Sequence, residues 1–354
     1  MKAVAIRRGS DEPALIDKPR PEPKHGEALV RTLRVGVDGT DHEVLSGSHG
    51  GFPDGEDHMV MGHEAVGVVE DPNGTGLEEG QHVVPTVRRK PNGETNKFFR
   101  RNEPDMAPDG EYFERGIVGA HGYMSEYFTS PADYLIPIDE EIAPYGIFVE
   151  PLSNTEKALE HARASRSAFK WDEESAAVLG NGPLGLLTLW QCAQEFDRAY
   201  CLGRRDRPDP TIDFIDKVGA TYIDSRETPV DEIPDDYEAM DFIYEATGYA
   251  PHAFETITAL DQNGVGALLG IPSSWDFEID GGSLHNDIVL HNKCLIGSVN
   301  AGLRHFEEAI EVVEAMPEDL LDHLVTTVTS PDDVAPAFDD GDDQIKAIVE
   351  FEAP

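Results

Sequence analysis

A glycine-rich turn that directly follows a short apolar segment constrains the fold of this 354-residue chain more than any other feature. Residues 175–179 form a largely apolar run of strand length. Gly180-x-Gly182-x-x-Gly185 comes next, and an apolar, helix-permissive stretch continues from 184 to 196. Strand, glycine turn and helix in this order are the context that a dinucleotide-binding fingerprint requires. We therefore predict a βαβ unit that binds a dinucleotide at this turn.

Each glycine of this turn has its own physical role. Gly180 makes the tight turn, Gly182 lets backbone N–H groups approach the pyrophosphate, and Gly185 lets the helix pack close to the sheet. The N-terminus of the helix then offers free N–H donors and a partial positive charge to the phosphates. The residues expected to bind the cofactor at the turn are Gly180, Asn181, Gly182, Pro183, Leu184 and Gly185.

The segment after the next predicted strand indicates which dinucleotide is bound. Enzymes that use NAD carry Asp or Glu about 20 residues beyond the glycines, whereas here Gly203, Arg204 and Arg205 follow the strand predicted at 198–202. Guanidinium groups suit a 2′-phosphate, and a merely solvated basic loop is disfavoured because positive charge is scarce in this chain. We expect these three residues to bind NADP, with NAD as a poorer second cofactor that Asp206 favours.

The composition is strongly acidic, with 28 Lys and Arg against 69 Asp and Glu and a net charge of −41. The acids are spread among well-patterned apolar segments, so a folded chain is favoured over a disordered one. Such a chain repels itself in dilute buffer, and molar salt shortens the range of the repulsion to about 3 Å. We expect a cytoplasmic protein of a high-salt cell. A nucleic-acid partner is disfavoured by the charge, and no apolar stretch approaches the ~20 residues of a membrane span.

The patterns predict an α/β chain of two domains. Residues 1–152 and 303–354 form a β-rich unit, and residues 153–302 alternate strands and helices, which predicts a doubly wound parallel sheet of the Rossmann type. The loops of the first unit carry Asp38, Asp41 and His42, and the polar run 88–110 is expected to be a surface lobe. Strands are predicted at 3–6, 27–35, 64–70, 81–86, 122–129, 175–179, 198–202, 220–223, 241–244, 265–269, 294–299 and 344–350, the last returning to the first unit, and helices at 142–164, 184–196, 211–218, 251–260 and 304–315.

Four motifs occur in one order along the chain: Val37-Asp38-Gly39-Thr40-Asp41, Gly62-His63-Glu64, Val149-Glu150-Pro151-Leu152-Ser153 and the glycine turn. With these motifs the chain resembles the zinc-dependent medium-chain dehydrogenases over nearly its whole length, and within them the glucose dehydrogenases of archaea, haloarchaea in particular. The resemblance implies a GroES-like catalytic domain beside the Rossmann domain, and a homodimer or homotetramer. It also implies oxidation of β-D-glucose, and of related aldoses, at C1 to the glucono-lactone with hydride transfer to NADP.

The resemblance further implies one catalytic zinc per subunit, held by Asp38, His63 and groups at Glu64 and Glu150. The family usually has Cys at the first of these positions. A carboxylate can bind zinc at about 2.0–2.2 Å but is less selective for zinc than a thiolate, so we expect weaker affinity, with manganese or magnesium as alternatives. Whether Glu64 binds directly or stands behind the ligands stays open. The stretch 88–114 contains no Cys, so no second, structural zinc is expected.

Each of these residues taken alone has an ordinary explanation. A single His before a strand is more often structural, Asp38 suits a turn, and Glu150 suits a helix start, where an acid interacts favourably with the dipole. A catalytic zinc needs about three protein ligands and one open position. The set of nitrogen and oxygen donors, found together in the order of the family, therefore favours a metal site.

The resemblance also implies the catalytic and substrate-binding residues. The hydroxyl of Thr40 would bind the substrate oxygen and pass its proton outward, so Thr40, Asp38 and His63 are the expected catalytic residues. His42 is either the next relay group or an exposed loop residue, and Asp41 would orient His63. The expected partners of the substrate are Thr40, Glu114, Glu150 and Asn300, while the segment 283–292 would lie near the nicotinamide or at a subunit contact.

Three other functions are compatible with the sequence. An alcohol or polyol dehydrogenase of the same fold would have an apolar substrate pocket in place of Glu114 and Glu150. A metal-free, NADPH-dependent quinone or enone reductase would be insensitive to a chelator. A nucleotide-binding regulatory protein would bind NADP without turnover, and this alternative stays open because Asp38 replaces the usual Cys ligand.

Overall fold

The computed structural model describes residues 1–91, 95–339, 341 and 343–354, which divide into two compact units. The first unit comprises Met1–Ser153 and Asn300–Pro354, and the second comprises Asn154–Val299. The domain limits expected from the sequence lie within three residues of these limits. Within the described part of the chain, no helix is both long enough and apolar enough to cross a membrane.

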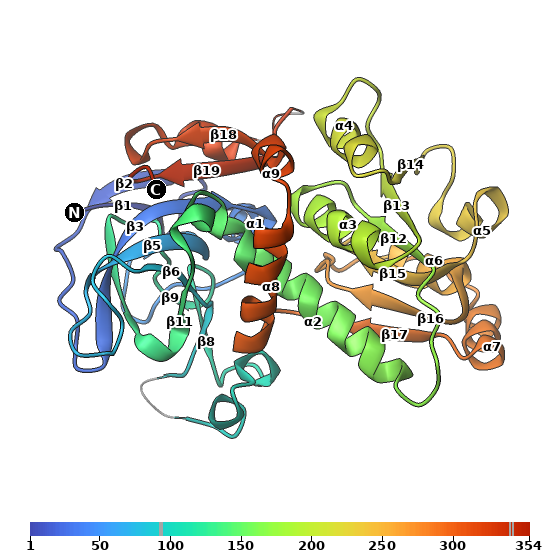
Figure 1. Ribbon diagram of the computed structural model, residues 1–354, viewed down its shortest axis with the longest axis horizontal. Helices are drawn as coiled ribbons and strands as arrows, with labels where there is room; N and C mark the ends of the chain where they lie inside the picture. The colour runs from blue at the N-terminus through green and yellow to red at the C-terminus, as the bar shows by residue number, and fades with distance from the viewer. Residues whose placement is uncertain (92–94, 340, 342) are drawn as a thin grey trace. The chain divides into compact units, whose positions relative to one another are not determined.

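The first unit is built on a mixed sheet in which the end of the chain pairs with its beginning (Figure 1). β19 (Lys346–Glu350) runs antiparallel to β3 (Glu27–Val37), with Val349 opposite Val35. This pairing confirms that the last predicted strand returns to the first unit. The sheet has the order β11 (Leu135–Pro137), β6 (His82–Pro85), β5 (Glu64–Asp71), β3 (Glu27–Val37), β19 (Lys346–Glu350) and β18 (Val325–Thr329), and β10 (Tyr127–Pro131) also pairs with β3.

Two smaller sheets and two C-terminal helices complete the first unit. One sheet has the order β2 (Pro13–Asp17), β1 (Lys2–Arg7) and β4 (His58–Val60), and the other has β7 (Arg88–Arg89), β8 (Phe113–Arg115) and β9 (Gly119–Ala120). The helices are α8 (Leu303–Ala315) and α9 (Glu318–Leu324). The buried guanidinium of Arg88 donates to the carboxylate of Glu114 at 2.9 Å and to the carbonyl of Asp105 at 2.7 Å, so it fastens the polar lobe to β8.

The structure corrects three predictions for this unit. The segment with Asp41 and His42 is not a loop but the short helix α1 (Gly39–Ser46), which ends at Gly47 in the left-handed conformation (φ 72°). The predicted helix 142–164 is divided into a 3₁₀ segment, Glu140–Phe148, and α2 (Val149–Arg166). The predicted strand 122–129 exists only at its end, as β10, because residues 122–124 lie against the 60–62 backbone instead.

The second unit contains the predicted parallel sheet (Figure 1). Its order is β14 (Thr221–Asp224), β13 (Arg198–Gly203), β12 (Ser175–Leu179), β15 (Met240–Glu245), β16 (Leu260–Leu268) and β17 (Cys294–Gly297), and all neighbours are parallel. Every residue of β12 is buried, as expected of a parallel strand that is covered on both faces. The strand order reverses between β12 and β15, and in such sheets ligands bind outside the carboxyl ends of the strands at this point.

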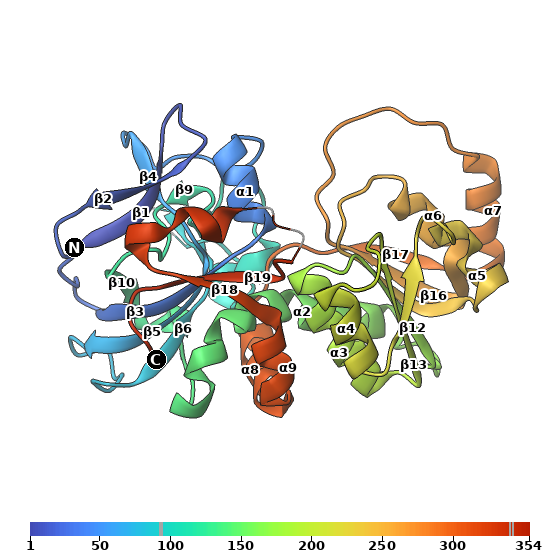
Figure 2. The same cartoon turned by 90° about the horizontal axis from the view of Figure 1, so that it is seen from above.

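Helices connect these strands, and one connection is a long loop. The helices are α3 (Pro183–Glu195), α4 (Pro210–Lys217), α5 (Ile233–Asp236), α6 (His252–Ala259) and α7 (Gly281–His291). The segment between β16 and α7 is extended and irregular, and Figure 2 shows it as a wide arc. The His- and Asn-rich segment 283–292 falls on α7 and its C-cap.

Candidate active site

Asp38 lies where β3 ends and α1 begins, and the two oxygens of its carboxylate make different contacts. Its backbone is extended (φ −133°, ψ −176°), and its Oδ1 accepts the N–H of Asp41 at 3.0 Å. The Oδ2 of Asp41 accepts the N–H of Asp38 in return, at 3.2 Å. These reciprocal bonds form a capping box that starts the helix. The other oxygen of Asp38, Oδ2, lies 3.5 Å from Nε2 of His63.

His63 is buried immediately before β5, with 4% of its side chain exposed. Its Nδ1 lies 4.0 Å from Oδ1 of Asp41 and, within the described residues, has no hydrogen-bond partner. Asp41 is itself held by the N–H of Gly62, which donates to Oδ1 at 3.2 Å. Burial lowers the pKa of His63, but the carboxylates of Asp38, Asp41 and Glu150 outweigh it and hold the pKa well above its usual value. The imidazole is thus surrounded by acids.

The residues present fit a divalent cation. Asp38, Asp41 and His63 offer ligand atoms that all lie within 4.8 Å of one another. Burial, together with the charges of Asp38 and Glu64, raises the pKa of Asp41 to about 7. A bound cation would compensate this concentration of negative charge around the buried imidazole of His63. Nitrogen and carboxylate oxygen donors are also ligands that zinc accepts.

Of the two remaining expected ligands, Glu150 lies near His63 and Glu64 points to a lysine. Glu150 is buried on the first turn of α2, and its charge acts on the pKa of His63. The carboxylate of Glu64 forms a buried ion pair with Lys346 of β19. Gly36 of β3 makes room for this pair, because a Cβ there would lie 2.2 Å from Oε2 of Glu64. The structure therefore brings Asp38 and His63 together with Asp41, places Glu150 where its charge acts on His63, and pairs Glu64 with Lys346.

Sequence reasoning missed Lys346, although a signal for it was present. Lys346 is one of ten lysines in the chain and stands in the apolar run 345–349. A lysine in such a run is buried only when it is paired. Its partner could not be read from the sequence, because Glu64 lies 282 positions earlier (346 minus 64).

A second group of metal-ligating side chains lies in the first unit, but a lysine occupies its centre. The group consists of Glu56, His58 and His121. The Nζ of Lys18 lies 2.9 Å from Nε2 of His58 and 3.1 Å from Nε2 of His121. The N–H of Val60 donates to Nδ1 of His121 at 3.1 Å, which leaves the ring proton of a neutral imidazole on Nε2. The ammonium group of Lys18 therefore lies where a metal ion would meet both imidazoles, so this group does not fit one.

Two of the expected substrate partners meet in the first unit. The amide of Asn300 donates to Oε1 of Glu114 at 3.3 Å, and both side chains are buried. Thr40 is half-buried on the first turn of α1, one residue beyond the helix start. His42, also half-buried on α1, contacts the ring of Phe338 edge-on, with a centroid separation of 6.0 Å.

The glycine turn of the second unit has the geometry its sequence predicts. Gly180 is in a positive-φ conformation (φ 114°), and a Cβ on Gly185 would lie 1.9 Å from the carbonyl oxygen of Gly180. A Cβ on Gly182 would meet open space. Gly182 is the residue before Pro183, the first residue of α3. The side chain of Asn181 donates to Thr211 and lies against Gly203, where a Cβ would be 2.7 Å away. The turn is therefore tight inside and open at the helix start.

The carboxyl ends of the neighbouring strands add polar groups to this edge of the sheet. Arg204 is exposed and Arg205 half-buried directly after β13. Glu245, at the end of β15, is buried and accepts the N–H groups of Thr247 at 2.7 Å and Gly248 at 3.0 Å. Sequence reasoning did not single out Glu245, although an acid followed by Ala-Thr-Gly at the end of an apolar strand was a signal for a polar turn.

Comparisons with known proteins agree with both units. A family model described as "Alcohol dehydrogenase GroES-like domain" matches residues 24–140, and one described as "Glucose dehydrogenase C-terminus" matches residues 143–351. The chain is 71% identical over 353 residues to the glucose 1-dehydrogenase of Haloarcula marismortui, with 100% of each chain covered. It is 63% identical to the glucose 1-dehydrogenase of Haloferax mediterranei, with 99% of each covered. A solved structure of the Haloferax mediterranei enzyme, described as a complex with NADP, Zn and gluconolactone, superposes with a TM-score of 0.98 at 62% identity and covers 100% of both chains.

The GroES-like and Rossmann-type units together define a medium-chain dehydrogenase. Within that class, the chain belongs to the zinc-type glucose dehydrogenase family. The resemblance and the fold predicted from the four sequence motifs are thereby confirmed.

Proposed function

We propose that the chain oxidises β-D-glucose, and related aldoses, at C1 to the glucono-lactone and transfers the hydride to NADP. The observation that carries this proposal is the cluster of Asp38, Asp41 and His63, with the charge of Glu150 acting on His63, in a chain that matches glucose 1-dehydrogenases over its whole length. The first unit then acts as the catalytic domain and the second as the dinucleotide-binding domain.

The proposed metal is one zinc ion per subunit, held by Asp38, His63 and Glu150. Glu64 is not a ligand in this proposal, because its carboxylate forms an ion pair with Lys346. When bound, zinc would polarise the C1 hydroxyl and lower its pKa. Thr40 stands two residues after Asp38 on the same helix turn, and its hydroxyl accepts the proton of the substrate and passes it outward. His42, two residues after Thr40 on α1, is the group proposed to pass this proton on to solvent.

Glu114 and Asn300 support a sugar as the substrate. A carboxylate and an amide that lie 3.3 Å apart can accept from and donate to several hydroxyl groups of a polyol. An apolar alcohol would offer these polar side chains no hydroxyl group beyond the one that reacts, so they would contribute less to its binding than to that of a sugar. This polar pair is the observation that favours a sugar dehydrogenase over an alcohol dehydrogenase of the same fold.

The proposed cofactor site runs from the turn 180–185 to Gly203, Arg204 and Arg205, at the carboxyl ends of β12 and β13. The N-terminus of α3 favours the pyrophosphate, and the two guanidinium groups favour the 2′-phosphate of NADP over NAD.

We further propose a homodimer or homotetramer that forms through the second unit, in a high-salt cytoplasm. β17 is the last strand of its sheet, and nearby apolar side chains are exposed, among them Val289 at 60%, Leu290 at 63% and Val299 at 50%. Side chains of this kind are typical of subunit contacts.

A substrate panel tests the proposed function. NADP reduction is followed at 340 nm (a wavelength at which NADPH alone absorbs) in molar KCl with glucose, galactose, ethanol and a linear polyol. We expect turnover with glucose, and a rise in the KM for glucose of at least about tenfold in Glu114→Gln and Asn300→Ala with kcat less affected, because lost uniform binding raises KM. Faster turnover of ethanol than of glucose would overturn the sugar assignment.

A further inference from the structure

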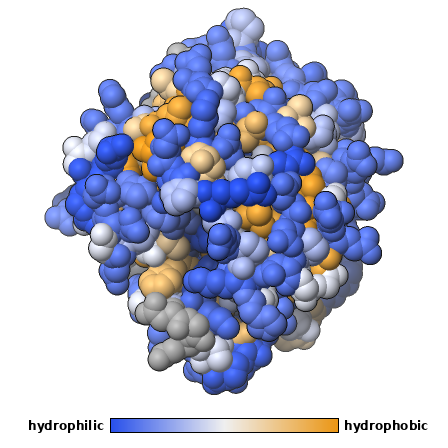
Figure 3. Space-filling model, turned by 90° about the vertical axis from the view of Figure 1, so that its left-hand side faces the viewer, coloured by the Kyte–Doolittle hydropathy of each residue, from blue (hydrophilic) through white to orange (hydrophobic). Residues whose placement is uncertain are grey.

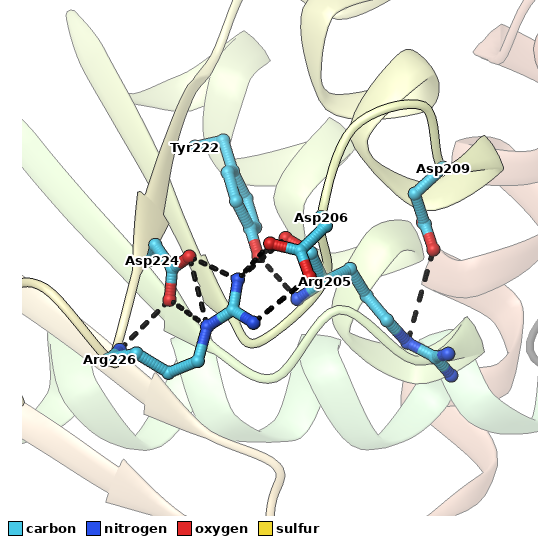
Figure 4. Close-up of polar contacts among 6 residues, drawn as sticks. All are labelled: Arg205, Asp206, Asp209, Tyr222, Asp224 and Arg226. Atoms are coloured by element: carbon cyan, nitrogen blue, oxygen red, sulfur yellow. Dashed lines mark hydrogen bonds and ion pairs between the residues drawn. The ribbon is translucent and has the colours of Figure 1, made fainter.

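Arg226 joins two acidic residues at the carboxyl ends of neighbouring strands of the Rossmann sheet (Figure 4). Its Nη2 lies 2.6 Å from Oδ1 of Asp206, and its Nη1 lies 3.2 Å from Oδ2. Its Nε donates to both oxygens of Asp224, at 2.9 and 3.1 Å. Its backbone N–H also donates to Asp224, at 2.9 Å. One guanidinium thus engages two carboxylates at once.

The cluster of Arg226, Asp206 and Asp224 lies at the carboxyl ends of β13 and β14, beside the proposed cofactor site. Asp206 lies three residues beyond the end of β13, and Asp224 is the last residue of β14. In Rossmann sheets an acid that follows the second strand accepts the ribose 2′-OH of NAD, and a 2′-phosphate in its place would be repelled. The side chain of Asp206 is 84% exposed, so its carboxylate is open to a ligand.

Arg226 also helps to shape the loop that carries the phosphate-binding arginines. The hydroxyl of Tyr222 accepts the N–H of Arg205 at 2.8 Å and donates to its carbonyl at 3.0 Å (Figure 4). The Nη2 of Arg226 reaches the same carbonyl at 3.5 Å. The hydrogen bonds to Arg226 hold the pKa of Asp206 and of Asp224 below the usual value, so both carboxylates are charged at neutral pH.

We propose that Arg226 determines the specificity for the phosphorylated cofactor by engaging Asp206 and Asp224, which would otherwise repel the 2′-phosphate and accept the ribose hydroxyl of NAD. This inference rests on the proposed cofactor site and adds a residue that the glycine turn and the arginine pair do not include. The contacts of 2.6–3.2 Å are comparable to the Debye length of about 3 Å at 1 M salt, so screening weakens them less than interactions over longer distances. The arrangement therefore persists at high ionic strength.

The test uses a cycle of variants and two cofactors. Dissociation constants of NADPH and NADH are measured by fluorescence titration in 2 M KCl for the wild type, Arg226→Gln, Asp206→Asn and the double variant, and the kcat/KM values with glucose are compared. We expect Arg226→Gln to lower the preference for the phosphorylated cofactor at least fivefold, and Asp206→Asn on that background to restore most of it. Arg226→Lys, which keeps the charge but loses the fork geometry, should fall between.

Two results would overturn the proposal. An equal loss of affinity for both cofactors in Arg226→Gln would mean that the residue only supports the fold. Unfolding in urea would then show a loss of stability in the same variant. A reduced preference that Asp206→Asn leaves unrestored would mean that Arg226 binds the phosphate directly. Because the titration needs no turnover, it reports on this proposal even if glucose is not the substrate.

Discussion

The carboxylate of Asp38 starts α1 with one oxygen and faces His63 with the other. A thiol at this position is a weak hydrogen-bond acceptor, so the aspartate gains a helix cap that a cysteine would not supply. The cost is a harder ligand that is less selective for zinc. The two roles are separable by substitution, because one depends on hydrogen bonding and the other on charge.

Asp38→Asn should keep the cap and lose the metal. Asn is as good an N-cap as Asp, so the free energy of unfolding should change by less than about 0.5 kcal/mol, whereas Asp38→Ala should lose about 1 kcal/mol. Both variants should lose most bound zinc, measured by atomic emission after dialysis against a zinc buffer. Full zinc occupancy in Asp38→Asn would remove Asp38 from the metal site.

Two glycines of the dinucleotide turn should respond oppositely to the same methyl group. Gly185→Ala forces a Cβ against the carbonyl of Gly180 and should lower the free energy of unfolding by at least about 2 kcal/mol. Gly182→Ala meets open space within the protein and should leave stability unchanged, but it should weaken NADPH binding, because the backbone can no longer approach the pyrophosphate. Urea unfolding and fluorescence titration separate the two effects. Unchanged NADPH affinity in Gly182→Ala would place the pyrophosphate elsewhere.

At the scale of elements, β19 supplies the buried partner of Glu64. Lys346 is 1% and Glu64 2% exposed, and removing one partner of a buried ion pair typically costs about 3–5 kcal/mol. Lys346→Met should therefore destabilise the protein by that amount in urea unfolding. The matched control is Lys2→Met, which breaks the exposed pair with Asp332 and should cost far less, because exposed ion pairs contribute little to stability. Equal costs for the two variants would show that the buried charge is compensated in some other way.

The elements that sequence patterns predicted well are those with long, regular apolar runs. The strands of the parallel sheet and α3 fall within two residues of their predicted limits, since the buried strands of a parallel sheet are mostly apolar. The exception is β16, which begins five residues before the predicted start, because its first residues include the polar run 261–263. The helix α1 was missed because its eight residues include only Val44 and Leu45 as apolar side chains, too few for a period. The break at 148/149 was missed because Phe148 and Val149, the residues on either side of it, are both apolar.

For the whole molecule, the net charge of −41 should make stability depend on salt. Figure 3 shows one face that is covered mainly by hydrophilic side chains, with separate hydrophobic patches. The free energy of unfolding should rise steeply between 0.1 and 1 M KCl and then flatten, because the Debye length falls from about 10 to 3 Å over that range. Unfolding in urea at several KCl concentrations measures this dependence. A linear rise that continues to 4 M would indicate specific ion binding instead of screening.

The order of motifs along the chain was sufficient to predict the family and the two-domain architecture. It also selected the residues of the candidate metal and cofactor sites, whose roles stay predictions. The ion pairs that complete those sites could not be predicted. Lys346 reaches Glu64 across the sheet, and Arg226 reaches Asp206 from the turn that follows β14. Such pairs depend on how strands from distant parts of the chain are placed side by side, which single-sequence patterns do not encode.

The measurement that tests the central claim most directly is NADP reduction by glucose in molar KCl, before and after treatment with a chelator and after zinc is added back. The account predicts that the chelator abolishes turnover and that zinc restores it in the wild type but not in Asp38→Asn. Turnover that the chelator leaves unchanged would contradict the metal mechanism and favour a metal-free reductase. NADP binding without turnover of glucose or any other sugar would contradict the proposed activity.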